Sequence, residues 1–225
     1  ALYSWGAGRD GKLGHGDLAE RWEPLRVAAL EHEHVMQASA GDSHSLAVTR
    51  AGEIFSCGLG ECGRLGHGDE ACHSQPVRIT AYAGKRVLRS AAGFYHSVVL
   101  LEGGTVSTFG DGRYGKLGHG DTEDQLVPAA VASLEHTEIV EVAAGYQHTV
   151  LRGHDATVYT SGIGWKGQLG HASLSDPQLG QDPDYYHSVR FLPVPRSHKS
   201  VGPYGWGSSA DVSDLNVGDL DIGFG

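Results

Sequence analysis

Cysteine, positive charge and long apolar runs are scarce in this sequence, and each scarcity excludes a class of protein. Three cysteines among 225 residues do not make a disulfide scaffold, so we expect a reducing, intracellular compartment, the cytoplasm rather than the nucleus. Lysine and arginine number 17 against 27 aspartate and glutamate residues, a net charge of −10 that argues against a nucleic-acid partner. No stretch approaches the roughly 20 apolar residues that span a bilayer, so no membrane span is predicted.

Glycine and histidine are abundant instead, with 34 and 14 residues, and an internal repeat accounts for much of both. A segment that we call the glycine box reads Trp-Gly-x-Gly-x-x-Gly-x-Leu-Gly-His-Gly-Asp in its first copy. Its leading glycines lie 52 residues apart, at Gly6, Gly58, Gly110 and Gly162. A second motif, the histidine box Ala-Gly-x-x-His-Ser/Thr, keeps the same spacing and begins at Ala40, Ala92 and Ala144. A proline marker shares this period at Pro24, Pro76 and Pro128, and its next match, Pro193, comes late.

The segments between these markers have the composition of short β-strands. They are rich in β-branched and aromatic residues and comprise residues 45–49, 53–56, 97–101, 105–109, 138–143 and 157–160. Long helical periodicity is absent, and a proline marker suits an edge strand because proline cannot donate to a ladder. A period of this length is typical of a propeller blade, so the sequence predicts an all-β fold of tandem sheets.

The two boxes resemble the signature of the RCC1-repeat (regulator of chromosome condensation-like) family. Their sequences are most similar to those of the RCC1-like domains of HERC-type proteins. The resemblance implies a seven-bladed β-propeller. We therefore predict a partial RCC1-type propeller with three full blades and part of a fourth. The RCC1-type repeats occupy residues 1–172, an insert with the degenerate fourth repeat occupies 173–196, and an irregular tail rich in Gly, Ser and Asp occupies 197–225. Because an open set of blades leaves sheet faces uncovered, we expect a subunit of a larger complex.

The repeats also argue against two candidate sites, a dinucleotide-binding loop and a metal site. The glycine box matches the Gly-x-Gly-x-x-Gly dinucleotide fingerprint, but four copies without a following helix favour turns that need positive φ. The repeated histidines occur once per repeat and so do not converge on one ion. We expect them to bond backbone groups that the turns leave unpaired. They are His15, His67, His119 and His171 in the glycine boxes and His44, His96 and His148 in the histidine boxes. No metal, cofactor or catalytic residue is predicted.

In both boxes the glycines and the histidine recur in each copy, while the residues at the loop tips between them vary. Variable loop tips on a rigid scaffold suit the recognition of other proteins. For Phe94 and Tyr146 the alternative is packing between blades. The candidate partner-binding residues are Asp42, His44, Phe94, Tyr95, Arg113, Tyr114, Tyr146 and Trp165.

The leading interpretation is a non-enzymatic propeller that acts as a protein–protein interaction module or scaffold. The family resemblance adds guanine-nucleotide exchange on a small GTPase, because Asp42 and His44 match a loop that some RCC1-type propellers use for it. An adaptor domain of a ubiquitin ligase or of a chromatin-associated protein is a further alternative. Light sensing through a tryptophan cluster ranks last, because the four tryptophans occupy different repeat positions.

Overall fold

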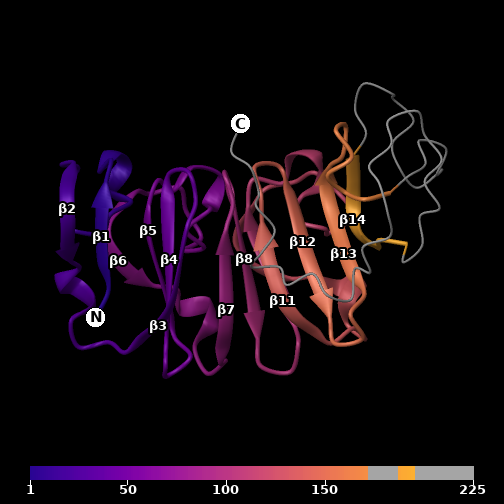
Figure 1. The fold of residues 1–225 in the computed structure, drawn as a ribbon, viewed down its shortest axis with the longest axis horizontal. Helices are drawn as coiled ribbons and strands as arrows, with labels where there is room; N and C mark the ends of the chain where they lie inside the picture. The colour runs from indigo at the N-terminus through magenta and orange to yellow at the C-terminus, as the bar shows by residue number, and fades with distance from the viewer. Residues whose placement is uncertain (172–186, 196–225) are drawn as a thin grey trace.

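The computed structural model describes residues 1–171 and 187–195, which form antiparallel sheets linked by short connections. In Figure 1 the sheets stand side by side in chain order, from β1 and β2 at one end to β14 at the other. The first sheet, which we call the half-blade, has two strands, β1 (Tyr3–Gly6) and β2 (Arg21–Arg26). Three four-stranded sheets follow, named here blades I, II and III.

Within each blade the strands are hydrogen-bonded in chain order. Blade I contains β3 (Val35–Ala40), β4 (His44–Thr49), β5 (Ile54–Gly58) and β6 (His73–Arg78). Blade II contains β7 (Val87–Ala92), β8 (His96–Leu101), β9 (Val106–Gly110) and β10 (Gln125–Ala130). Blade III contains β11 (Ile139–Ala144), β12 (His148–Gly153), β13 (Val158–Ile163) and β14 (His187–Pro193).

The helical segments of the described residues are single 3-10 turns, and none is long and apolar enough to cross a membrane. Three lie inside glycine boxes, at η1 (Arg9–Gly11), η3 (Glu61–Gly63) and η5 (Arg113–Gly115). The other three connect one sheet to the next, at η2 (Ala28–Leu30), η4 (Thr80–Tyr82) and η6 (Ala132–Leu134). The predicted all-β fold and its partial propeller are therefore confirmed.

The incomplete blade lies at the N-terminus, whereas the repeat pattern predicted it after three full blades. The reason is that a blade and a repeat are out of phase. In each blade the first two strands, such as β3 and β4 of blade I, flank a histidine box. The last two strands, such as β5 and β6, flank the glycine box that follows it. The first glycine box therefore belongs to the half-blade. Of the insert predicted over 173–196, residues 187–193 form β14, and the tail predicted over 197–225 lies outside the described residues.

The proline marker sits on the outermost strands, where no neighbouring strand needs its missing amide. Pro76 in β6 and Pro128 in β10 each precede the residue that faces the middle of the adjacent strand. In β14 the same register position is held by Phe191, because Leu192 pairs with Thr160. The assignment of Pro193 as the fourth marker was therefore wrong, and an aromatic residue replaces the proline there.

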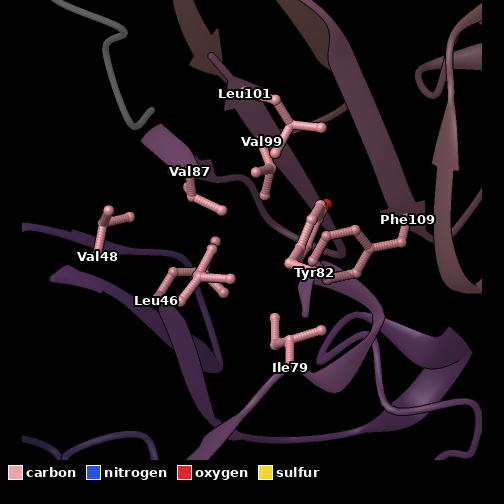
Figure 2. Close-up of a cluster of buried hydrophobic side chains, with 9 residues drawn as sticks. Leu46, Val48, Ile79, Tyr82, Val87, Val99, Leu101 and Phe109 are labelled. Atoms are coloured by element: carbon pink, nitrogen blue, oxygen red, sulfur yellow. The ribbon is translucent and has the colours of Figure 1, made fainter. Parts of the chain in front are cut away.

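Apolar side chains from adjacent sheets form the cores between them. Figure 2 shows the cluster between blades I and II, where Leu46 and Val48 of blade I face Val99 and Phe109 of blade II, with Tyr82 of the connection η4 among them. A second cluster joins blades II and III. Because each sheet buries its face on the next, a blade is stabilised mainly by its neighbours.

Candidate protein-binding surface

The glycine box and the histidine box meet at the same end of every blade. The last residue of β5, Gly58, pairs with the first residue of β4, His44, and the same pairing recurs in blades II and III. The loops 41–43 and 59–72 therefore lie together at one end of blade I. Their counterparts from blades II and III line the same face, so the variable tips form one surface.

The leading glycine of each box allows this close meeting. Gly58 has φ +116°, and a Cβ atom there would lie 2.3 Å from the carbonyl oxygen of Ser43 in the histidine box. Gly110 shows the same pattern with φ +106° and a Cβ position 2.5 Å from the carbonyl oxygen of Tyr95. No residue with a side chain fits at either position without moving the backbone.

The glycine-box histidines hold their own loops through a hydroxyl group. Nε2 of His67 lies 2.9 Å from Oγ of Ser56, and that hydroxyl donates to the carbonyl of Leu65 at 2.8 Å. Since a hydroxyl has a single proton, the imidazole donates to it. The histidine thus reaches the Leu65 carbonyl through a hydroxyl group, and for His119 a hydrogen bond with the backbone of Thr108 also acts to raise its pKa, against the larger lowering effect of burial. The same arrangement pairs His15 with Ser4, His119 with Thr108 and His171 with Thr160.

The histidine-box histidines connect one blade to the next. Nε2 of His44 lies 2.9 Å from Oγ of Ser97, and Nε2 of His96 lies 2.8 Å from Oγ1 of Thr149. His44 is completely buried, and this burial, with a smaller effect of the Arg64 charge, lowers its pKa to about 3. We therefore remove His44 from the candidate binding residues, because it supports the loop from beneath.

Three aromatic rings cluster on the shared face between blades II and III. The ring centroid of Phe94 lies 4.3 Å from that of Tyr95 and 4.2 Å from that of Tyr146. Two arginines face Tyr95, with Cζ of Arg64 at 4.4 Å and Cζ of Arg113 at 5.6 Å from its centroid. Arg64 is completely buried, whereas Arg113 is exposed and Tyr146 is 54% exposed. We call Phe94, Tyr95, Arg113 and Tyr146 the aromatic cluster.

A buried polar network fixes the loops beneath the aromatic cluster. Nζ of Lys116 is 2.8 Å from Oδ2 of Asp111 and 2.6 Å from Oε1 of Gln147, and the same carboxylate accepts hydrogen bonds from Arg113. Burial tends to raise the pKa of Asp111, but the hydrogen bonds from Arg113 and Lys116 outweigh it and hold the pKa at about 2. The glycine-box loop and the histidine-box loop are thereby connected through a paired, hydrogen-bonded charge.

The remaining predicted residues stand elsewhere on the loops. Asp42 is exposed, with its carboxylate accepting a hydrogen bond from Ser43. The Tyr114 ring lies 6.5 Å from His187 of β14. Trp165 is 58% exposed on the glycine-box loop of blade III. The structure thus brings together four of the eight predicted residues.

The sequence reasoning missed the side chains that support the aromatic cluster. Lys116 and Arg64 occupy the position before Leu-Gly-His in their glycine boxes, and Lys12 holds it in the first box. Nζ of Lys12 donates to the carbonyl of Asp42, so each of these cations reaches toward the next histidine-box loop. A basic residue with the period of the repeat was the available signal. Across residues 1–171 and 187–195, no three His, Cys, Asp or Glu side chains are grouped to hold a metal ion.

Comparisons with known proteins identify the repeat. The family profile described as "Regulator of chromosome condensation (RCC1) repeat" matches residues 1–48, 51–100 and 103–152. The ultraviolet-B receptor UVR8 of Arabidopsis thaliana is 42% identical over 175 residues, which are 78% of this chain and 40% of the relative. The human E3 ubiquitin-protein ligase HERC2 is 38% identical over 174 residues, 76% of this chain and 4% of that protein. The chain thus spans less than half of either relative.

Solved structures show the same fold. Prp20p of Saccharomyces cerevisiae superposes with a TM-score of 0.71 at 20% identity, over 86% of this chain and 46% of Prp20p. Human WBSCR16 superposes with a TM-score of 0.70 at 22% identity, over 86% of this chain and 47% of that protein.

Proposed function

Because this chain belongs to the RCC1-repeat family, we propose that it is a non-enzymatic protein-binding module, within a larger assembly, whose recognition surface is the aromatic cluster. The observation that carries the proposal is an exposed tyrosine and an exposed arginine that surround two further rings on a rigid base. Tyrosine and arginine are the residues that most often dominate binding energy in protein interfaces.

The network beneath the cluster supports a binding role over a packing role. Asp111 and Lys116 are completely buried and hold the loop backbone, so the exposed Tyr146 side chain is not needed to position the loops. Pre-formed loops lose little conformational entropy when a partner binds. The alternative that Phe94 and Tyr146 only fill the space between blades is disfavoured for Tyr146, which leaves more than half of its surface exposed.

Affinity capture with quantitative mass spectrometry tests the proposal. The chain and its Arg113→Ala/Tyr146→Ala variant are used as baits at matched concentration in a native extract. We expect the variant to lose its specific partners at least tenfold, because each hot-spot truncation costs about 1 to 2 kcal/mol. The thermal midpoint is measured beside the capture, because Arg113→Ala also removes hydrogen bonds to the buried Asp111 and should lower the midpoint, whereas Tyr146→Ala alone should leave it nearly unchanged.

A matched control is Trp22→Ala, which removes a more exposed aromatic residue, 89% exposed, from the half-blade. The control should keep every partner that the double variant loses. Equal capture by the chain and the double variant would overturn the proposal.

Nucleotide exchange on a small GTPase is the second candidate, favoured by one observation. Asp42 is exposed at the tip of the blade I histidine box, where an acidic group could meet a partner. The structural relative Prp20p has been solved and studied for its binding to Gsp1p and histones. Release of a fluorescent nucleotide from a panel of small GTPases is the test. Acceleration that Asp42→Ala abolishes would support exchange, and no acceleration with any of them would reject it.

A further inference from the structure

Arg64, beneath the aromatic cluster, is a buried cation whose guanidinium group is only partly paired. It lies between two four-stranded blades, since it belongs to the glycine box of blade I and its carbonyl accepts a hydrogen bond from Ser97 of blade II. Nε donates to the carbonyl of Glu61 at 2.9 Å, and Nη2 lies 3.1 Å from Oε2 of the same residue. Nη1 has no hydrogen-bond partner among the described residues. A buried donor without an acceptor is costly, so the guanidinium retains an unused capacity to bind one.

The equivalent cation of blade II has a full set of partners. Lys116 contacts the carboxylate of Asp111 and Oε1 of Gln147, and both of these partners are buried. At the same two repeat positions blade I has Leu59 and Tyr95. Leucine has no polar atom, and the tyrosine presents the face of its ring to the guanidinium, with 4.4 Å between Cζ and the ring centroid. The two buried acceptors that complete the site in blade II are therefore replaced by apolar groups in blade I.

Glu61 supplies the carboxylate that pairs with Arg64, and it does so from the surface. Its side chain is 61% exposed, and a single oxygen contacts the guanidinium. Ion pairs with an exposed partner are weak, because water competes for the charges. A bidentate pair is stronger, since both carboxylate oxygens accept from two N–H groups of one arginine. A second carboxylate that excludes water and engages Nη1 together with Nη2 would therefore bind better than Glu61 does.

Tyr95 joins this guanidinium to the rest of the aromatic cluster. Cζ of Arg64 and Cζ of Arg113 lie 4.4 Å and 5.6 Å from the centroid of its ring. Glu61 and Arg113 hold the same repeat position, at the tips of successive glycine boxes, and both are exposed. A side chain that contacts the cluster thus arrives beside two guanidinium groups, one of which is covered by a replaceable carboxylate.

We propose that the aromatic cluster recognises an acidic side chain, an aspartate or glutamate of a partner protein, and that this carboxylate displaces Glu61 from Arg64. The proposal rests on the protein-binding role proposed above and adds the chemistry of the partner. In the free chain Glu61 is an internal competitor that keeps the buried cation paired. In the complex the partner's carboxylate binds Nη1 and Nη2 together and provides the acceptor that Nη1 lacks.

Binding of an acidic peptide to the full chain tests this chemistry. The probe is fluorescently labelled hexaglutamate, and the control is hexaglutamine with the same label, both at about 0.15 M salt. The chain carries a net charge of −10 and repels an acidic peptide as a whole, so saturable binding requires a local site. Fluorescence anisotropy measures the affinity. We expect saturable binding of hexaglutamate and none of hexaglutamine.

A gain of affinity identifies Glu61 as the competitor. Glu61→Gln should strengthen hexaglutamate binding about two- to fivefold, the range that corresponds to one partly exposed ion pair. Glu123→Gln is the matched control, because it removes the same charge from an exposed acid of the neighbouring glycine box and should change the affinity much less. A misfolded variant does not bind more tightly, so the gain is not a consequence of unfolding.

Arg64→Met tests whether the competition acts through the buried cation. It should weaken hexaglutamate binding at least tenfold, and in this background Glu61→Gln should no longer strengthen it. The absence of saturable binding, equal binding of hexaglutamine, or equal effects of Glu61→Gln and Glu123→Gln would each overturn the proposal. Loss of captured partners by Arg113→Ala/Tyr146→Ala without any hexaglutamate binding would reject the acidic partner and retain the binding surface. Unchanged capture by that variant would reject the surface itself.

Discussion

Two interfaces of the molecule have the same backbone arrangement but different side-chain packing. One lies between the half-blade and blade I, and the other lies between blades I and II. The interface between blades I and II is packed by large side chains, as Figure 2 shows. The interface between the half-blade and blade I contains an apolar groove of about 160 Å3, whose lining includes Ala47 and Cys57. At three equivalent repeat positions the two interfaces differ in side-chain size. Between blades I and II stand Phe109, Tyr82 and Val99, and between the half-blade and blade I stand the smaller Cys57, Leu30 and Ala47. The repeat therefore determines the positions of the sheets, while the individual side chains determine how densely adjacent sheets pack.

The two interfaces also differ in how they use histidine. His44 is buried between blades I and II as a donor to Ser97, and no described histidine plays this role between the half-blade and blade I. Burial favours the neutral imidazole, so the interfaces that contain His44 and His96 should be sensitive to acid.

Acidification is expected to produce the largest effect. Burial lowers the pKa of His44 to about 3 and that of His96 well below its usual value. An unfolded histidine titrates near 6.5, so the stability due to these residues is complete above about pH 6.5 and falls as the pH drops toward the folded pKa. Each histidine should reduce the free energy of unfolding by about 1.4 kcal/mol per pH unit in this window. Urea unfolding from about pH 7 to about pH 5 measures the slope.

The matched comparison for this slope uses two variants. In His44→Gln/His96→Gln the pH dependence should become shallower by about 2.7 kcal/mol per pH unit. In His32→Gln, where the side chain is 92% exposed, the slope should not change. A double variant that keeps the original slope would show that the buried histidines do not control acid stability.

Truncation of a core aromatic residue should separate the two interfaces next. Phe109 is completely buried and its ring occupies the space beside Gly66, so Phe109→Ala should lower the free energy of unfolding by about 3 to 5 kcal/mol. Cys57→Ala removes a smaller group at the equivalent position beside the groove and should cost about 1 kcal/mol. Chemical denaturation of both variants is the measurement. Equal losses would contradict the difference in packing that Figure 2 and the groove indicate.

Much of this fold could be predicted from the sequence, because a strict period of 52 residues defines sheets, turns and edges together. The phase of the blades could not, since a motif does not state which strands hydrogen-bond. Trp5 shows the consequence, because it matches Phe109 in sequence yet is 59% exposed at the end of the row. The variable tips were a correct guide to exposed loops, but the Lys116–Asp111 contact beneath them depends on side-chain geometry that spacing does not encode.

A single hydroxyl tests the finer fit of the second interface. The Tyr82 hydroxyl lies 2.7 Å from Oγ of Ser107, and both side chains are buried. Tyr82→Phe should cost about 1 kcal/mol, because Ser107 loses this partner. In a cycle with Ser107→Ala, the double variant should cost less than the sum of the two single variants. Simple additivity in thermal or urea unfolding would show that the bond contributes nothing.

Filling the groove is the smallest expected effect and the only one that should stabilise the chain. Ala47 lines the groove, and its counterpart in blade II is the completely buried Val99. Ala47→Val adds two methyl groups to a strand position that favours β-branched residues, so the free energy of unfolding should rise by about 0.5 to 1 kcal/mol. The reverse change, Val99→Ala, should destabilise, because it opens a cavity in a filled interface. If Ala47→Val also destabilises, the groove is too narrow for a valine, and the first interface is then shaped by tight packing against β1 instead of by missing side-chain volume.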